Sequence, residues 1–310
     1  MDASTAARPR GCVAVTGATG FIGTHLLRQL REDGYAVRAL TRTPRQSADD
    51  GSLTWIAGDL SDGRGVEQLV EGASAVVHCA GAVRGARPID FDAINVAGTA
   101  RVGAAAEAAG VQRLLSLSSL AAREPGLSMY ASSKRRGEDV LTNCRVPWTL
   151  FRPPAVYGPG DKELVPLFRL MMQGVAIVPG HVGRTSLIYV TDLVRAIGAW
   201  LAAPTLNGHC FEVDDGTPGG YDWSEMIRIA TELRGEPIRR VNVPRYVLAS
   251  IGTANLWLGR VLHRAPMLTS GKVRELFHLD WVCHTQSIRH TLHWQPEVRF
   301  AEGLRLTFPV

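Results

Sequence analysis

Two side chains that could carry proton chemistry stand four residues apart in the segment Tyr130-Ala131-Ser132-Ser133-Lys134. On a helix this spacing places the phenol of Tyr130 and the ammonium of Lys134 on one face. The ordinary pKa of a phenol is about 10, and a neighbouring ammonium in a partly desolvated cleft can lower it. Such a pair suits hydride transfer at a carbon–oxygen centre, where the reduced oxygen needs a proton. We expect Tyr130 to be the acid/base and Lys134 to lower its pKa.

Two adjacent serines precede this pair by about a dozen residues, in Leu117-Ser118-Ser119-Leu120. They follow an apolar run that reads as a strand, and parallel sheets place their sites at the carboxyl ends of strands. A hydroxyl there can hydrogen-bond the substrate oxygen and orient it. We assign this role to Ser119 and keep Ser118 as the competing serine.

A glycine-rich turn follows the first apolar run, in Thr16-Gly17-Ala18-Thr19-Gly20-Phe21-Ile22-Gly23. In the spacing GxxGxxG, Gly17 permits a tight turn, Gly20 lets the backbone approach a pyrophosphate, and Gly23 lets the helix pack closely on the strand. The free N–H groups of a helix N-terminus would then face the anion. This context between a strand and a helix predicts a dinucleotide site, and a merely structural turn is the alternative.

The end of the second predicted strand bears on which dinucleotide binds. It reads Leu40-Thr41-Arg42-Thr43, with no acid to hold a ribose 2′-hydroxyl. Arg42 can pair with a 2′-phosphate, with Arg38 or Arg45 assisting, although it can also be an ordinary solvated arginine. We therefore favour NADP and keep NAD as the alternative. Asp59, after the third strand, is placed to accept a hydrogen bond from the adenine amino group or to cap a helix.

Strands and helices must alternate to position these groups, and the apolar pattern predicts that they do. Helical patterns separate most of six short apolar runs that read as strands, at 12–15, 36–40, 53–56, 75–78, 113–117 and 148–151. Strict alternation implies right-handed crossovers and a parallel sheet. We predict an α/β fold with a doubly wound parallel sheet of the Rossmann type over residues 11–152.

The sequence pattern changes after Arg152, because the alternation of apolar runs ends and prolines and aromatic residues recur irregularly. Residues 153–310 are expected to form mainly a smaller C-terminal lobe that binds substrate. Residues 185–202 are the exception, because a strand and a capped helix there are expected to return to the first lobe. Residues 1–10 are expected to be a disordered tail. The segment 246–262 is predicted to be a packed amphipathic helix, and a helix that meets a membrane surface or a partner is the alternative.

Composition limits the other classes of function. Lys and Arg number 34 against 29 Asp and Glu, and this excess of five is too dilute for a nucleic-acid groove. No uninterrupted run of 18 apolar residues and no secretory leader are seen, so we expect no stable membrane insertion. Five scattered cysteines favour a reducing compartment, and hence the cytoplasm. His284, His290 and His293 fit no closed metal-binding pattern, so no metal is expected.

Together these motifs make the chain similar to the extended short-chain dehydrogenase/reductase family over nearly its whole length. The matching segments are TGATGFIG (16–23), GDL (58–60), HCAG (78–81), INVAGT (94–99), LSS (117–119), YASSK (130–134), RPPAVYGPGD (152–161) and VTD (190–192). The resemblance implies a catalytic triad of Ser119, Tyr130 and Lys134, with Lys134 also binding the nicotinamide ribose. Asn95 resembles a helix asparagine that is mainly structural. The expected cofactor contacts are Gly17, Thr19, Gly20, Phe21, Ile22, Gly23, Arg42, Asp59, Leu60, Ala80, Gly81, Tyr130, Lys134 and Pro153.

Three activities share this scaffold, and the sequence favours one of them. Dehydratases resemble a pattern with Asp-Glu beside the active-site hydroxyl, whereas Leu120 and two alanines follow Ser119 here. Epimerases often carry an asparagine where this chain is apolar, and a diphosphate-binding arginine at the position of Thr185, although Arg184 could still serve. We therefore predict NADP-dependent interconversion of a ketone and a secondary alcohol on a medium-sized substrate. A nucleotide-sugar epimerase using bound NAD is the alternative, followed by a non-catalytic dinucleotide-binding subunit or redox sensor. The resemblance also suggests a homodimer.

Overall fold

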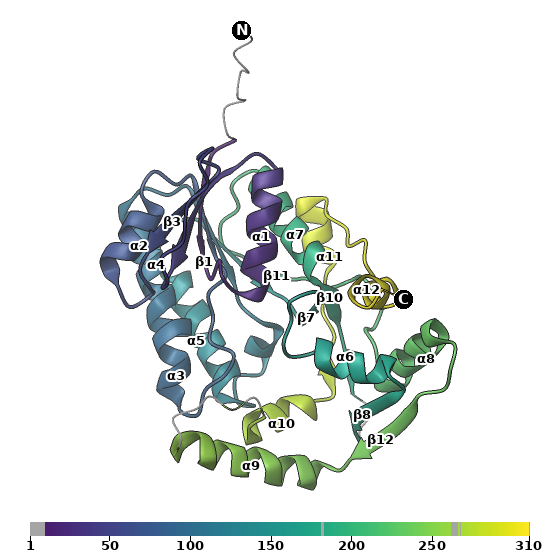
Figure 1. Cartoon of the computed structure of the whole chain (residues 1–310). Helices are drawn as coiled ribbons and strands as arrows, with labels where there is room; N and C mark the ends of the chain where they lie inside the picture. Colours follow the sequence, from purple (N-terminus) through teal and green to yellow (C-terminus); the bar gives the residue numbers. More distant parts are fainter. Residues whose placement is uncertain (1–9, 181–182, 262–265, 267, 310) are drawn as a thin grey trace.

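A seven-stranded parallel sheet forms the centre of the computed structural model, which describes residues 10–180, 183–261, 266 and 268–309 (Figure 1). The spatial order of the strands is β11-β6-β5-β4-β1-β2-β3. Every neighbouring pair in this sheet is parallel. Their bounds are β1 Cys12–Thr16, β2 Ala36–Thr41, β3 Leu53–Ala57, β4 Ala75–His78, β5 Arg113–Leu117, β6 Trp148–Arg152 and β11 His209–Glu212.

The direction in which strands are added reverses between β1 and β4. The chain first builds outward from β1 through β2 to β3, then returns to the other side of β1 and continues through β4, β5 and β6. Such a switch point leaves a crevice at the carboxyl ends of the two central strands, because the loops there run to opposite faces of the sheet. This confirms the predicted doubly wound fold and sets the place of the site.

Helices cover both faces of the sheet, as Figure 1 shows. Because side chains alternate along a strand, Val13 and Val15 of β1 enter one buried cluster and Ala14 enters the other. The first cluster includes residues of α1 (Phe21–Glu32), α7 (Val190–Ala202) and α11 (Gln286–Leu292). The second includes residues of α2 (Gly63–Val70), α4 (Thr99–Ala108) and α5 (Met129–Thr142).

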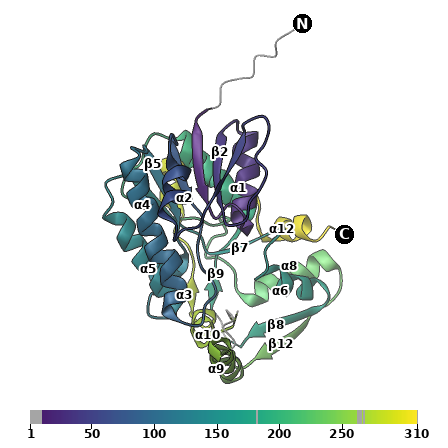
Figure 2. The ribbon, with the colours of Figure 1, turned by 60° about the vertical axis from the view of Figure 1, so that its left-hand side comes forward.

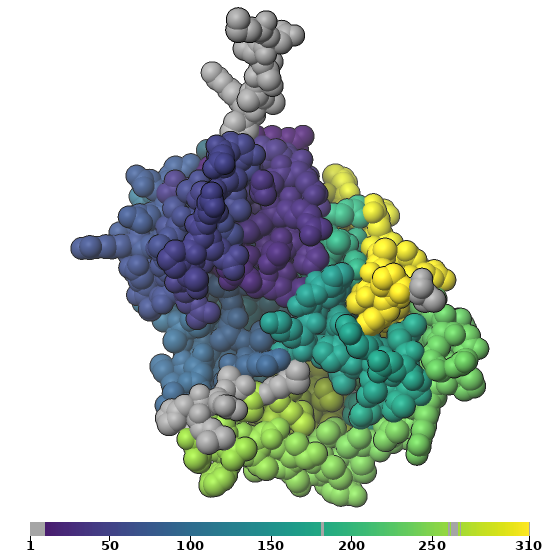
Figure 3. All heavy atoms as spheres, in the orientation of Figure 1, coloured from purple at the N-terminus to yellow at the C-terminus, as the bar shows by residue number. Residues whose placement is uncertain are grey.

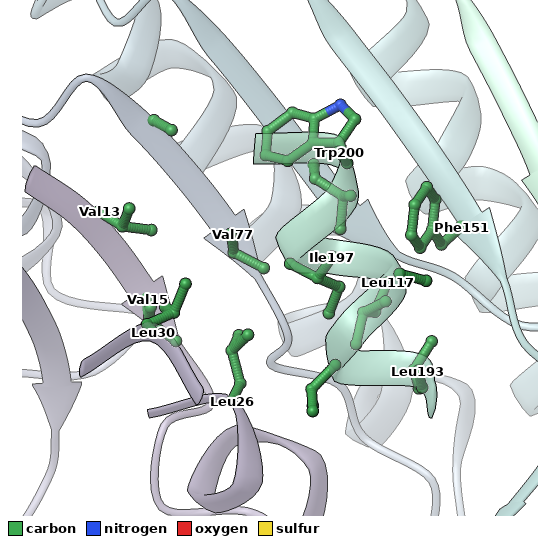
Figure 4. Close-up of a cluster of buried hydrophobic side chains, with 14 of the residues drawn as sticks. Val13, Val15, Leu26, Leu30, Val77, Leu117, Phe151, Leu193, Ile197 and Trp200 are labelled. Carbon is green, nitrogen blue, oxygen red and sulfur yellow. The ribbon is translucent and has the colours of Figure 1, made fainter. Parts of the chain in front are cut away.

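Helix α7 belongs physically to the sheet of the first lobe. Figure 4 shows Leu193, Ile197 and Trp200 of this helix beside strand residues of the sheet and Leu26 of α1. Trp200 is fully buried, and its indole N–H donates to the hydroxyl of Thr149 at 3.1 Å. Helix α7 is therefore a structural part of the first lobe, although it follows the first strands of the second lobe in the chain.

Strand β11 also joins this sheet, which the sequence reading did not anticipate. His209–Glu212 pairs in parallel with β6, so residues assigned by sequence to the second lobe supply the seventh strand. Phe211 packs edge-to-face against Phe151 of β6 with 6.0 Å between the ring centroids. The chain thus passes between the two lobes several times after Arg152.

The second lobe consists of short parallel strand pairs and helices around a separate apolar cluster (Figure 2). Tyr157, Phe168 and Phe300 form the aromatic centre of that cluster, with ring centroids 5.1 to 5.8 Å apart. The strand pairs are β7 (Ala155–Tyr157) with β10 (Leu187–Tyr189), β8 (Val175–Pro179) with β12 (Arg239–Val243), and β9 (Arg184–Thr185) with β13 (Asp280–Trp281). The helices are α6 (Val165–Met172), α8 (Trp223–Arg234), α9 (Arg245–Val261), α10 (Ser270–Leu276) and α12 (Phe300–Thr307).

Two further findings concern sequence predictions. Among the described helices, none is both long and apolar enough to cross a bilayer. Within the same part of the chain, no three His, Cys, Asp or Glu side chains are grouped so that they could hold a metal ion. The expected disordered tail, residues 1–10, lies outside the described residues except for Arg10.

Candidate active site

The glycine turn between β1 and α1 leaves no room for side chains. Gly17 has a φ of +68°, which favours glycine, and a Cβ there would lie 2.6 Å from the backbone nitrogen of Ala80. A Cβ at Gly23 would overlap the carbonyl oxygen of Gly17. The turn is held by a hydrogen bond of 3.0 Å from Gly20 N to Gly17 O, and α1 begins immediately after Gly20.

This cradle fits the pyrophosphate of a dinucleotide. Gly20 caps α1 without any side-chain hydrogen bond, and the first turn of α1 holds no acidic residue. Its first N–H groups and the positive end of the helix dipole therefore face the turn, as anion sites require. Thr19 is exposed at the tip of the turn, and Phe21 and Ile22 begin the helix half-buried.

The end of β2 presents one free arginine and two occupied ones. Arg42 is exposed, and its charge helps to lower the pKa of Asp59. Arg38 donates to the carbonyl oxygens of Leu69, at 3.1 Å, and Gln68, so it is tied to the end of α2. Arg45 lies over the ring of Trp55 at 5.1 Å. Of these three arginines, Arg42 is the one for which the described residues provide no hydrogen bond or ring contact.

Asp59 already has partners in its own turn. Its Oδ1 accepts hydrogen bonds from the hydroxyl of Ser61 at 2.5 Å and from the backbone N–H of Ser61 at 2.6 Å and of Asp62 at 3.2 Å. The bond from the Ser61 hydroxyl, followed by the backbone bonds, lowers the pKa of its carboxyl. The N-cap of α2 is Asp62. Leu60 beside it is buried, and a Cβ at Gly98 would lie 2.9 Å from the Leu60 side chain. Asp59 therefore shapes the turn, and its second oxygen has no partner among the described residues.

The structure distinguishes the two candidate serines. Ser118 donates to Glu138, and Glu138 also accepts from Arg152 Nε at 2.8 Å, so Ser118 belongs to a buried structural group. Ser119 Oγ instead accepts from the backbone N–H of Ala121 at 3.2 Å, and its hydroxyl is close enough to Tyr130 to help lower the pKa of that phenol. The backbone N–H of Leu120, the next residue, donates to the carbonyl oxygen of Pro153 at 2.9 Å, which places Pro153 beside this serine.

Lys134 is buried behind this pair. Its Nζ donates to the carbonyl oxygen of Leu117 at 2.7 Å, at the carboxyl end of β5. A Cβ at Gly81, after β4, would lie 3.6 Å from the same Nζ. Burial lowers the pKa of Lys134 to about 8, and the nearby carboxylate of Glu138 opposes that fall. The ammonium therefore lies between the carboxyl ends of β4 and β5, at the edge of the sheet where the crevice opens.

The pKa of Tyr130 departs from the sequence expectation. Burial raises it above the ordinary value, while the hydrogen bond with Ser119 and the charge of Lys272 act to lower it. The expected lowering by Lys134 is not among these influences on the phenol. The reason is that Lys134 is anchored to the backbone of Leu117 and is itself poorly solvated, while the cation that acts on the phenol comes from α10.

A family model settles the family. The model described as "NAD dependent epimerase/dehydratase family" matches residues 13–213, which span β1 to just beyond β11. The chain belongs to this family. It is an NAD(P)-dependent oxidoreductase of the extended short-chain dehydrogenase/reductase type.

Two relatives and one solved structure illustrate the range of this family. A ceramide reductase of Caulobacter vibrioides is 36% identical over 276 residues, covering 88% of this chain and 86% of that protein. A UDP-glucose 4-epimerase of Vibrio cholerae is 26% identical over 326 residues, covering 95% and 94%. The structure of MoeE5 in complex with UDP-glucuronic acid and NAD has a TM-score of 0.72 and 23% identity, covering 96% and 97%. That structure shows the likeness of fold.

In this family member, Asn95 joins the cofactor edge to the catalytic helix. Its Nδ2 donates to Ser133 Oγ at 2.8 Å and to the carbonyl oxygen of Ala82 at 3.0 Å, and its Oδ1 accepts from Ala82 N at 2.8 Å. It lies in a π-helical turn (Ala93–Gly98) that leads into α4. Asn95 therefore holds the loop after β4 against α5, and Ser133 Oγ extends this network by donating to the carbonyl oxygen of Tyr130 at 2.7 Å.

A buried, uncharged histidine stabilises the carboxyl ends of β1 and β4 in this oxidoreductase. His78 Nδ1 lies 2.7 Å from Thr16 Oγ1, and His78 Nε2 lies 3.1 Å from Thr99 Oγ1. Burial lowers the pKa of His78 to about 3, with Lys134 acting in the same direction. The imidazole is uncharged at neutral pH, so it joins β1, β4 and α4 without adding charge near Lys134.

Sequence reasoning missed two residues of α10 that belong to this oxidoreductase site. Lys272 acts on the phenol of Tyr130 electrostatically, and Glu275 pairs with Lys272 at 3.0 Å. Glu275 is buried and also accepts a hydrogen bond from Ser128, the N-cap of α5. No motif marks these residues, because they lie in a short helix far along the chain from Tyr130.

Proposed function

We propose that this chain is an NADP-dependent reductase that interconverts a ketone and a secondary alcohol on a long-chain lipid of the ceramide class. The observation that carries the proposal is the anchoring of Lys134 Nζ to the carbonyl oxygen of Leu117 at the end of β5, with Tyr130 on the same helix and Ser119 acting on its phenol. A bound nicotinamide dinucleotide would supply or accept the hydride. Gly17, Gly20 and Gly23 would hold its pyrophosphate, and Lys134 would bind its nicotinamide ribose.

The chain's own groups account for the proton and the orientation of the substrate. In the reductive direction the Tyr130 hydroxyl gives its proton to the substrate oxygen, which becomes an alcohol. Ser119 donates a hydrogen bond to the same oxygen and fixes its position. The positive charge of Lys134 favours the phenolate that remains, once bound ligands exclude water from the cleft.

The identity of the substrate class rests on the relative of Caulobacter vibrioides. A ceramide carries a secondary hydroxyl group, and the oxidised counterpart of that group is a ketone. The 36% identity extends over 88% of this chain, so it includes most of the second lobe as well as the dinucleotide-binding lobe. This supports a similar hydrophobic substrate here.

A specific observation disfavours the nucleotide-sugar epimerase. Arg184, which stands next to the position expected for a diphosphate-binding arginine, is already neutralised. Its guanidinium pairs with Asp222 at 3.3 Å and Glu225 at 2.9 Å, and Nε donates to the carbonyl oxygen of Gly219 at 2.6 Å. An arginine held by two carboxylates is a poor partner for a diphosphate.

The preference for NADP rests on Arg42. It is exposed at the end of β2, and no carboxylate follows it that would repel a 2′-phosphate. We expect the change Arg42→Ala to raise KM for NADPH by roughly tenfold or more and to leave KM for NADH within about twofold, since one charge-assisted phosphate contact is worth about 1.5–3 kcal/mol. Equal effects on the two cofactors would argue for NAD.

The reaction is tested by following NADPH oxidation with a 3-ketoceramide in detergent, and with UDP-glucose as the competing substrate class. Wild type should turn over the ketone, and Tyr130→Phe should reduce kcat/KM by roughly 10²–10⁴-fold while NADPH still binds. Conversion of UDP-glucose would support the epimerase instead. Tight NADPH binding with no turnover of any carbonyl compound would support the redox sensor.

A further inference from the structure

Helix α9 exposes five large apolar side chains to solvent, while Val247, Leu248 and Leu256 are half-buried. The five exposed ones are Tyr246 (73% exposed), Trp257 (65%), Val261 (54%), Leu258 (48%) and Ile251 (45%), and we call them the α9 face. The other exposed positions between Tyr246 and Leu258 hold only small uncharged residues: Ser250, Thr253 and Ala254. A helix on the surface of a globular protein ordinarily presents charged and polar residues there.

The inner side of α9 shows that this arrangement is built into the packing. Gly252 faces α10, and a Cβ on it would lie 2.8 Å from the backbone of Thr269. Gly259, seven residues later and on the same side of the helix, is also buried. Because glycines form the close contact with α10, the bulky residues occupy the outer side. Figures 1 and 2 show α9 along the lower edge of the molecule, with α10 between it and α5.

All the Lys, Arg, Asp and Glu residues in the segment around α9 are basic ones. From Pro237 to Arg274 there are seven Lys and Arg residues and no Asp or Glu, whereas the rest of the chain has 27 basic and 29 acidic residues. Arg239 and Arg240 on β12 and Arg245 at the start of α9 are all exposed. Among the described residues none of these three has a carboxylate partner within 4.0 Å. Arg240 donates to Asn242 Oδ1 at 2.8 Å and to Ser224 Oγ at 3.1 Å, and Arg245 lies over the ring of Phe277 at 5.6 Å. Since these partners are uncharged, the positive charge beside the α9 face is not neutralised and can attract an external anion.

We propose that the α9 face and its flanking arginines dock this protein onto an anionic lipid bilayer, with α9 lying in the plane of the headgroups. An apolar helix face bordered by Arg is the pattern of interfacial helices, and Tyr and Trp are the residues that favour the boundary between water and lipid. Figure 3 shows that the light-green segment containing α9 forms the lower edge of the molecule, so a flat surface can approach it.

A second copy of the chain fits this surface less well. A two-fold contact through α9 would place the arginine flank of each copy against the same region of its partner. Like charges facing one another across an interface cost free energy, whereas anionic headgroups neutralise them. The charge on the surface thus selects the bilayer over self-association.

The position of α9 relative to the catalytic groups gives this contact a use. Helix α9 packs on α10, and α10 supplies Lys272 and Glu275 beside Tyr130 and Ser128. A lipid that leaves the bilayer next to α9 would pass along α10 to reach Tyr130. That use rests on the proposed function, whereas the membrane contact rests on the surface alone.

Vesicle flotation of the full chain tests the contact without any enzyme assay. Wild type should float with vesicles of phosphatidylcholine mixed with phosphatidylglycerol, and much less with phosphatidylcholine alone. Leu258→Ser should weaken binding to the mixed vesicles by roughly tenfold, because a buried leucine is lost from the contact. Leu306→Ser on α12 is the matched control, since Leu306 is 50% exposed against 48% for Leu258, and it should have no effect.

Charge is tested by the double change Arg239→Gln and Arg240→Gln, which should weaken binding to the mixed vesicles by roughly twentyfold. Three results would overturn the proposal: wild type that does not float, equal binding by Leu258→Ser and Leu306→Ser, or a dimer in light scattering that Leu258→Ser converts to monomer. Turnover of 3-ketoceramide in detergent reports on the proposed function separately, so the two can fail independently.

Discussion

Glu275 accepts a hydrogen bond from Ser128, the residue that begins the helix bearing Tyr130 and Lys134. The Ser128 hydroxyl in turn accepts from the backbone N–H of Ala131 at 2.9 Å. The two partners are 147 residues apart in the chain, and they come from different lobes. The catalytic helix therefore starts against a buried carboxylate that the second lobe supplies.

We expect Glu275→Ala to weaken both the fold and the site. It removes the acceptor of the buried Ser128 hydroxyl and the partner of Lys272, so the free energy of unfolding should fall by about 1–3 kcal/mol. Because the start of α5 loses its support, kcat should fall while NADPH affinity changes little. Urea unfolding and steady-state kinetics measure the two effects.

The control is Glu302→Ala, which breaks an exposed ion pair with Arg305 and should lower the free energy of unfolding by less than about 1 kcal/mol. Equal stability of the two variants would contradict the buried role of Glu275.

The two adjacent serines should separate catalysis from stability. Ser119→Ala removes the hydroxyl that acts on the phenol of Tyr130 and should lower kcat/KM by roughly 10–100-fold with little change in the free energy of unfolding. Ser118→Ala removes a donor to the buried Glu138 and should lower the free energy of unfolding by about 1 kcal/mol with nearly normal turnover. The reverse pattern of effects would make Ser118 the catalytic serine.

Lys134 should give stability an unusual dependence on pH. Burial lowers its pKa from 10.5 to about 8, so between these values the unfolded chain holds a proton that the folded chain lacks. By linkage its contribution to stability rises with pH across that window, by up to about 3 kcal/mol, and it is a constant cost below pH 8. Urea unfolding of wild type and Lys134→Met over this range isolates the effect. Wild type should gain stability relative to the variant as the pH rises, and a flat or falling difference would show that Lys134 keeps an ordinary pKa.

The glycine turn should tolerate no added methyl group. Gly23→Ala places a Cβ against the carbonyl oxygen of Gly17, so the helix must move away from the strand. NADPH binding should fall by more than about tenfold, because the helix N-terminus that would hold the pyrophosphate shifts with it. Fluorescence titration measures the affinity. Gly63→Ala is the control, since a Cβ there meets nothing within 4 Å. Normal binding by Gly23→Ala would remove the turn from the dinucleotide site.

The first lobe could be predicted from sequence because its signals are local. Each of its six strands is a short apolar run, and the glycine turn stands between one of them and a helix. The spacing of Tyr130 and Lys134 likewise survives in the structure, since both residues lie on α5 and turn toward the end of β5.

The remaining features depend on contacts between distant segments, which no local pattern records. Strand β11 is four residues long and includes His209 and Glu212, so its place beside β6 comes from tertiary packing alone. Arg38 and Arg184 could each reach several partners, and only the fold decides that they bind backbone oxygens and carboxylates. The cation that acts to lower the pKa of Tyr130 is Lys272, and no local sequence pattern points to that residue.

The repeated passage of the chain between the two lobes makes them inseparable. A fragment that ends at Arg152 would lack both α7 and β11, leaving the outer edge of β6 unpaired and the apolar surface beneath Trp200 bare. Open strand edges and bare apolar surfaces promote aggregation. Exchange of substrate lobes between relatives would therefore have to graft several discontinuous pieces at once, and the dinucleotide-binding half would not survive as an independent module.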